Sequence, residues 1–106
     1  MKRVLIVIMV TACLSVPTNV PAQKVGGGDL TFTPKNALPV VFSHEYHVIK
    51  KGLKCIDCHY KIFQMAQGSY EMEMDELTKG AFCGKCHNGR KAFDVKEKKN
   101  CIRCHR

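Results

Sequence analysis

Three pentapeptides of one pattern lie within residues 55–105: Cys55-Ile-Asp-Cys58-His59, Cys83-Gly-Lys-Cys86-His87 and Cys101-Ile-Arg-Cys104-His105. In each, two cysteines separated by two residues are followed at once by a histidine. This pattern is the attachment signature of a c-type haem, because both thiols can form thioethers to one porphyrin while the adjoining histidine binds the iron. The sequence therefore predicts three covalently bound haem c groups.

Paired Cys-X-X-Cys units also occur in zinc ribbons and in dithiol oxidoreductases, so those two kinds of site are the alternatives. Neither of them requires a histidine directly after the second cysteine. All three pairs of this chain have one. We therefore favour haem attachment over zinc binding and over thiol redox chemistry.

The amino terminus has the features of a secretory signal peptide. Lys2 and Arg3 precede an apolar run over residues 4–16, which is shorter than the about 20 residues that a membrane-spanning helix needs. Val20-Pro21-Ala22 supplies small or medium residues before a cleavage site. We predict that residues 1–22 are removed and that the exported protein begins at Gln23.

Cys13 lies outside the three motifs and leaves a second possibility. Val10-Thr11-Ala12-Cys13 loosely resembles a lipoprotein box, in which an acylated cysteine would tether the protein to a membrane. The apolar run continues beyond Cys13, which favours cleavage after Ala22 instead.

The predicted mature chain is small and basic. Without residues 1–22 it keeps 84 residues, of which fifteen are basic and nine acidic, so that its net charge is +6. A chain of this length cannot build a large side-chain core, and we expect the haems to form the core. The haem propionates offset the positive charge, so the basic composition does not indicate nucleic-acid binding, and no other feature does.

The segment before the first motif predicts a short β-hairpin followed by a helix. Residues 29–33 and 40–42 read as the two strands, with a turn at residues 34–37 between them. Ser43 is an acceptable N-cap for a helix over residues 44–51, and Gly52 then ends it.

His44 and His47 are the two histidines outside the motifs. They stand three residues apart, so they project from neighbouring positions on one side of the predicted helix. An isolated surface histidine is commonly a solvated side chain. Because three irons each need a sixth ligand, we predict instead that both histidines are distal haem ligands.

Phe42-Ser43-His44-Glu45-Tyr46-His47, followed by the three motifs, resembles the triheme cytochrome c7 family within the class of cytochrome c3-like proteins. The resemblance spans about residues 29–106, and residues 23–28 precede it as a flexible glycine-containing lead. It implies a small, mostly irregular and α-helical fold around a haem core, with a short amino-terminal β-hairpin. It also implies a monomeric periplasmic electron carrier.

The resemblance further implies which histidines share an iron. His44 would bind opposite His59, and His47 opposite His87. The usual pattern supplies another distal histidine before the second motif, and this sequence has none.

The region of the missing histidine contains Met72 and Met74 among four acidic residues. It resembles the variant of the family in which the third haem has histidine and methionine ligands. Met74 aligns best with that methionine and Met72 is the second choice, in a helix that begins near Glu73. The alternatives are that both methionines pack against porphyrin, or that the iron bound by His105 keeps an open position.

The function that follows is transfer of single electrons between membrane oxidoreductases and terminal acceptors or outer-membrane conduits. Its partners would be redox proteins of the inner membrane, the periplasm and the outer membrane. A small haem reductase acting at an open third haem is one alternative. A docking haem domain within a larger assembly is another.

The carboxy-terminal part of the chain carries most of the positive charge. Residues 79–106 hold nine Lys or Arg and two acidic residues. We expect this basic face to attract an acidic redox partner. The alternative is that these lysines only solvate the surface and balance the haem propionates.

Overall fold

The computed structural model describes residues 20–66, 68 and 71–106. The predicted signal peptide, apart from residues 20–22, and the Cys13 alternative lie outside the described residues. In the part of the chain that the structure describes, no helix is long and apolar enough to cross a membrane.

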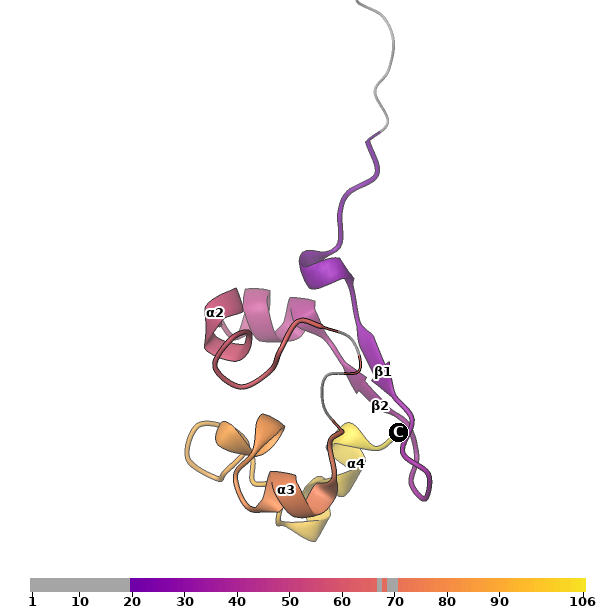
Figure 1. Cartoon of the computed structure of the whole chain (residues 1–106), viewed down its shortest axis with the longest axis vertical. Helices are drawn as coiled ribbons and strands as arrows, with labels where there is room; N and C mark the ends of the chain where they lie inside the picture. Colours follow the sequence, from indigo (N-terminus) through magenta and orange to yellow (C-terminus); the bar gives the residue numbers. More distant parts are fainter. Residues whose placement is uncertain (1–19, 67, 69–70) are drawn as a thin grey trace, which may run out of the picture.

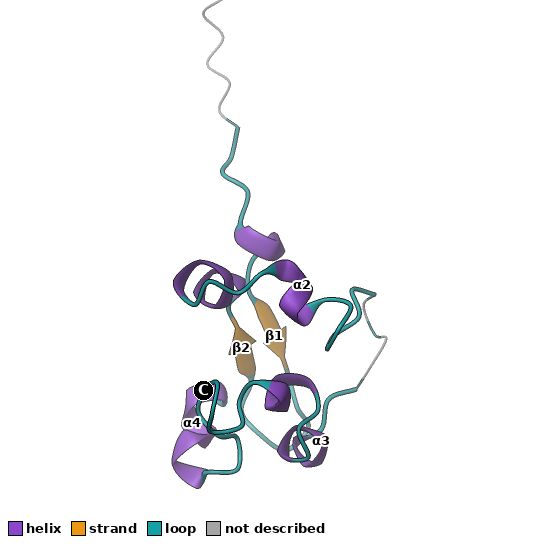
Figure 2. Cartoon of the chain, turned by 90° about the vertical axis from the view of Figure 1, so that its left-hand side faces the viewer, coloured by secondary structure: helices purple, strands orange, loops and turns teal. Residues whose placement is uncertain are grey.

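The predicted β-hairpin is confirmed. Strand β1 (Leu30–Phe32) pairs antiparallel with β2 (Val40–Phe42), and Leu30 lies opposite Phe42 (Figure 1). Aromatic and β-branched residues favour these two segments as strands. The first haem motif lies near one end of the hairpin, and the other two motifs lie near its opposite end (Figure 2).

The helix predicted after the hairpin is present, but most of it is wound more widely than an α-helix. Helical backbone begins at His44, and Tyr46–Lys50 forms a π-helical turn closed by a 3.1 Å hydrogen bond from the Lys51 N–H to the Tyr46 carbonyl. The Ser43 hydroxyl accepts the Tyr46 N–H at 3.2 Å, which confirms the predicted N-cap. Gly52 follows with a φ of 70°, the conformation that ends many helices.

Each haem motif begins as one short helical turn. The N–H of each motif histidine donates to the carbonyl of the first cysteine of its own motif, at 2.9 Å in all three cases. This repeated hydrogen bond brings the histidine of each motif back beside its first cysteine. The three turns are α2 (Cys55–Cys58), the 3-10 turn Phe82–Lys85 and α4 (Cys101–Cys104).

Helix α3 (Met74–Thr78) packs against the turn of the second motif. Glu73 precedes its first residue, as predicted for a helix that begins near Glu73. Gly84 is buried at this contact, and a Cβ atom there would collide with the Leu77 carbonyl. A glycine at this motif position therefore lets α3 approach closely.

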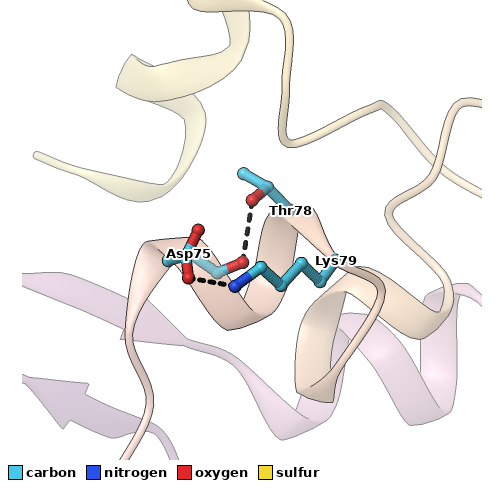
Figure 3. Close-up of polar contacts among 3 residues, drawn as sticks. All are labelled: Asp75, Thr78 and Lys79. Atoms are coloured by element: carbon cyan, nitrogen blue, oxygen red, sulfur yellow. Dashed lines mark hydrogen bonds and ion pairs between the residues drawn. The ribbon is translucent and has the colours of Figure 1, made fainter.

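Figure 3 shows the polar contacts on α3. Asp75 forms an ion pair with Lys79, and the Thr78 hydroxyl donates to the Asp75 carbonyl at 2.8 Å. Both charged side chains are largely exposed, so the pair contributes little to stability.

The carboxy terminus returns to the hairpin. His105 bridges to Val40, and the Arg106 N–H donates to the Pro39 carbonyl at 3.0 Å. The 3-10 turn Lys98–Asn100 leads directly into α4. The third motif is thereby fixed against β2.

The glycine-rich lead contains one short helical turn. Val25–Gly27 forms a 3-10 turn, and Gly26 and Gly28 both lie against the His44 ring. The lead thus contacts a residue sixteen positions further along the chain, and its flexibility stays a prediction.

None of the hydrophobic side chains in the described residues is buried, and several large ones are more than half exposed, such as Tyr60, Met65 and Ile102. Packing of side chains alone therefore does not account for the fold of this chain. The finding fits the prediction that haem faces supply the apolar core.

Candidate functional site

His44 and His59 face each other across a space of the size of one metal ion. Their ring centres are 6.4 Å apart and the ring planes are 18° from parallel. An imidazole nitrogen lies about 2 Å from the transition metal that it binds, so two imidazoles on opposite sides of one ion have centres roughly 6 Å apart. The structure thus brings together the first pair that the sequence predicted.

His47 and His87 form a second pair with the same spacing. Their ring centres are also 6.4 Å apart, while their planes cross at 71°. One histidine of each pair comes from the helix after β2 and the other from a haem motif. Both pairs therefore fit an iron held between a motif histidine and a distal histidine.

The second ring nitrogens are arranged as metal-binding histidines require. A histidine that binds a metal through one nitrogen usually donates the other N–H to a carbonyl or a carboxylate, which sets its orientation and raises its basicity. Four of the five histidines donate their Nδ1–H to a backbone carbonyl, which leaves Nε2 for iron. The acceptors are Gly28 for His44 (2.5 Å), Ser43 for His47 (2.9 Å), Phe93 for His87 (3.2 Å) and Leu38 for His105 (2.8 Å).

The Nδ1 atom of His59 is the exception. It is buried and has no hydrogen-bond partner among the described residues. The two imidazoles of the first pair therefore differ at Nδ1: that of His44 donates a hydrogen bond to the Gly28 carbonyl, whereas that of His59 makes none with the described residues.

Burial favours the metal-binding form of His87. It lowers the pKa of this histidine, an effect that the hydrogen bond to the Phe93 carbonyl opposes and that the neighbouring His47 and Arg103 strengthen. A neutral imidazole is the form that binds a metal.

Phe42, the last residue of β2, contacts both predicted distal ligands. Its ring stacks on His47 with centres 4.4 Å apart and meets His44 edge-on at 5.0 Å. The hairpin thereby positions the two histidines together. The sequence pattern predicts that Phe42 packs on porphyrin, whereas only the fold shows that its ring also contacts His44 and His47.

Phe93 has a comparable place beside the second motif. Its ring centre lies 4.3 Å from that of His87, and the Arg103 guanidinium lies over the Phe93 ring, 4.6 Å from the ring centre. The sequence signal for this residue was only its position between two motifs.

Cysteines of different motifs lie close enough to influence one another. Burial raises the pKa of the Cys83 thiol to about 11, and the neighbouring Cys104 thiol adds to the shift. Burial also raises the pKa of Cys58, with Cys86 as the next contributor. The attachment sites are therefore neighbours in space, the first next to the second and the second next to the third.

The third site differs from the other two. The five histidines of the sequence leave none to face His105. Met74 is the first residue of α3, with 46% of its surface exposed, and Met72 is partly buried just before it. Methionine ligation at the third site stays a prediction.

Comparison with known proteins gives one matching family model, described as cytochrome c7 and related cytochrome c, over residues 40–106. A solved c7-type three-heme cytochrome domain is 33% identical, with 82% of this chain and 96% of that chain covered and a TM-score of 0.65. Among curated proteins, no sequence matches significantly.

Two larger solved structures are also similar. The amino-terminal hexaheme fragment of a dodecaheme cytochrome c is 40% identical, with 74% of this chain and 48% of the fragment covered and a TM-score of 0.66. The carboxy-terminal hexaheme fragment is 32% identical, with 81% and 49% covered and a TM-score of 0.64. The chain spans about half of each fragment.

The paired rings generate a direct test. His44→Ala should convert the iron bound by His59 from low-spin to high-spin, and His47→Ala should do the same for the iron bound by His87, because each change removes one axial ligand. Absorbance and electron paramagnetic resonance spectra of the purified protein would measure one high-spin haem in three. A single variant in which all three irons stay low-spin, at unchanged potentials, would show that its pairing is wrong.

Proposed function

The chain belongs to the cytochrome c7 family, and we propose on that basis that it carries single electrons in the periplasm between membrane oxidoreductases and terminal acceptors or outer-membrane conduits. The observation that carries the proposal is the pair of facing histidine couples, each with the spacing of two imidazoles on one metal ion. The three covalently bound haem c groups of this family supply one-electron redox chemistry when bound.

The residues of the chain are suited to electron transfer without bond making. We assign His59 and His87 as proximal ligands, with His44 and His47 as their distal partners. Two imidazoles fill both axial positions of an iron, so that substrate has no place to bind there. The cysteines attach the groups covalently, and the first two attachment sites lie close together, since the Cys86 thiol contributes to the raised pKa of Cys58.

The third attachment site supports an alternative function. His105 has no imidazole partner in the sequence, so a small haem reductase acting at an open iron is the second candidate function. We propose Met74 as the ligand that closes this position, with Met72 as the alternative. The haem would be attached through Cys101 and Cys104.

Export is part of the proposal. We assign residues 1–22 as a signal peptide, residues 23–28 as the lead, and residues 29–106 as the triheme domain, which acts as a monomer. Acylation at Cys13 would instead give a membrane-tethered protein, and it would favour a docking domain of a larger assembly.

The proposed carrier should accept three electrons per chain, one at each iron. Coulometric titration of the purified protein should count three one-electron equivalents, and mass spectrometry of the same periplasmic sample should show three haems and an amino terminus at Gln23. An acylated terminus at Cys13 would contradict the soluble form, and rapid turnover of nitrite or peroxide would favour the reductase.

Met74→Ala should open the third iron to carbon monoxide, because it removes the thioether ligand. Met74→His should lower the potential of this haem, since methionine ligation favours the ferrous state relative to imidazole. Carbon monoxide difference spectra and redox titration would measure both changes. Met72→Ala is the matched control, and a response to Met72→Ala with none to Met74→Ala would transfer the role to Met72.

A basic surface near the second and third motifs is the proposed docking site for an acidic redox protein. Lys96, Lys98 and Lys99 are exposed there, and Lys99 pairs with Glu97 at 2.8 Å. Among the described residues, Lys99 alone of these three lysines forms an ion pair, so the ammonium groups of Lys96 and Lys98 are available to attract negative charge on another protein.

Reversing Lys96, Lys98 and Lys99 to glutamate should slow electron exchange with an acidic redox partner by about tenfold at low salt, because steering is lost. Stopped-flow rates as a function of ionic strength would measure the effect, with unchanged haem spectra as the check on folding. Reversal of Lys50, Lys51 and Lys54, which are also exposed, changes the net charge equally at another place. Equal slowing by both triple variants, or a rate that salt does not change, would refute a local docking site.

A further inference from the structure

A glycine turn before the hairpin contacts the first predicted distal ligand. Two hydrogen bonds close the turn, from the Gly27 N–H to the Lys24 carbonyl at 3.1 Å and from the Gly28 N–H to the Val25 carbonyl at 3.0 Å. The turn precedes residue 40, where the matched family model begins. We call residues 24–28 the glycine turn.

Gly26 provides room for the His44 ring. A Cβ atom at this position would lie 2.5 Å from both Cγ and Cδ2 of that ring, a distance at which something must move. The φ of Gly26 is +60°, a conformation that residues with a side chain adopt at a cost. The ring can therefore pack directly on the backbone only because this residue is a glycine.

Gly28 orients the same ring. Its carbonyl accepts the Nδ1–H of His44 at 2.5 Å, which leaves Nε2 as the ring nitrogen available to a metal. The φ of Gly28 is +103°, so this carbonyl also depends on a conformation that favours glycine.

The opposite side of the site offers no equivalent. The buried Nδ1 of His59 has no partner in the part of the chain that the structure describes. A hydrogen bond to the second nitrogen raises the basicity of a histidine ligand. Among these residues, the Gly28 carbonyl is thus the acceptor that can strengthen an axial ligand of this iron.

We propose that the glycine turn positions His44 and strengthens its bond to iron, and that it thereby lowers the potential of the haem attached at Cys55 and Cys58. The inference rests on the proposed role of His44 as a ligand. Gly26 and Gly28 are positioning residues, because they act through the His44 ring and do not touch the iron.

Gly26→Ala and Gly27→Ala form a matched pair. Both glycines have positive φ, at +60° and +82°, so both substitutions strain the backbone. Only at position 26 would the new methyl group meet the His44 ring, since a Cβ atom at Gly27 has nothing within 4 Å. A difference between the two variants therefore measures the contact with His44.

In Gly26→Ala, His44 should bind the iron of His59 less tightly, so cyanide should replace it more easily and bind about tenfold more strongly. Loss of a residue that supports a metal ligand lowers metal affinity by about 10-fold to 100-fold, and this estimate takes the lower value. A tenfold change in the relative affinity of His44 for ferric over ferrous iron corresponds to about 59 mV for a one-electron couple, so the potential should rise by this order. Gly27→Ala should match wild type in both measurements. Haem-methyl resonances would identify the haem that changes.

A measurement on the wild-type holoprotein needs no variant. Nuclear Overhauser contacts should join the Gly26 α-protons to the His44 ring protons in the fully reduced protein. Absence of these contacts would overturn the proposal, even if Gly26→Ala failed to accumulate with three haems. Identical behaviour of the two alanine variants would overturn it as well.

His44→Ala separates the two possible failures. If this variant keeps the iron of His59 low-spin, the ligand role of His44 is wrong and the proposed site fails. If it becomes high-spin while Gly26→Ala behaves like Gly27→Ala, the ligand role stands and only the role of the glycine turn is wrong.

Discussion

An iron held between two histidines would need its ligands on opposite sides of one porphyrin, and this short chain brings each of the two histidine pairs together from separate segments. The helix after β2 supplies His44 and His47, while their partners come from the first and second motifs. Facing imidazoles thus tie the amino-terminal half of the chain to its attachment sites. The hairpin, the π-helical turn and the contacts of Phe42 all serve this geometry.

Backbone carbonyls, rather than polar side chains, orient four of the five histidines. The acceptors for His44 and His105 lie sixteen and sixty-seven residues away along the sequence, in the glycine turn and before β2. A carbonyl is present whatever the side chain, so substitutions at Leu38 keep the acceptor as long as the backbone path is kept. Gly26 and Gly28 differ, because their backbone conformations favour glycine.

The energetics of the fold follow from the same arrangement. No hydrophobic side chain of the described residues is buried, and the surface ion pairs contribute little. Covalent attachment at six cysteines and apolar contact with porphyrin faces replace the usual core in a chain of this size. We therefore expect haem binding to be coupled to folding, with the haems as structural groups as well as redox groups.

Local patterns in the sequence were sufficient to predict the three attachment motifs, the hairpin, the Ser43 cap and the start of α3, because each depends on residues within a few positions of one another. The resemblance carried by residues 42–47 also implied which histidines pair, and their spacing supports it. Only the tertiary structure could show that the glycine lead packs on His44, that Leu38 accepts the His105 N–H, and that His59 lacks an equivalent partner. These features arise from contacts between residues far apart in the sequence, and no local periodicity or motif predicts such contacts.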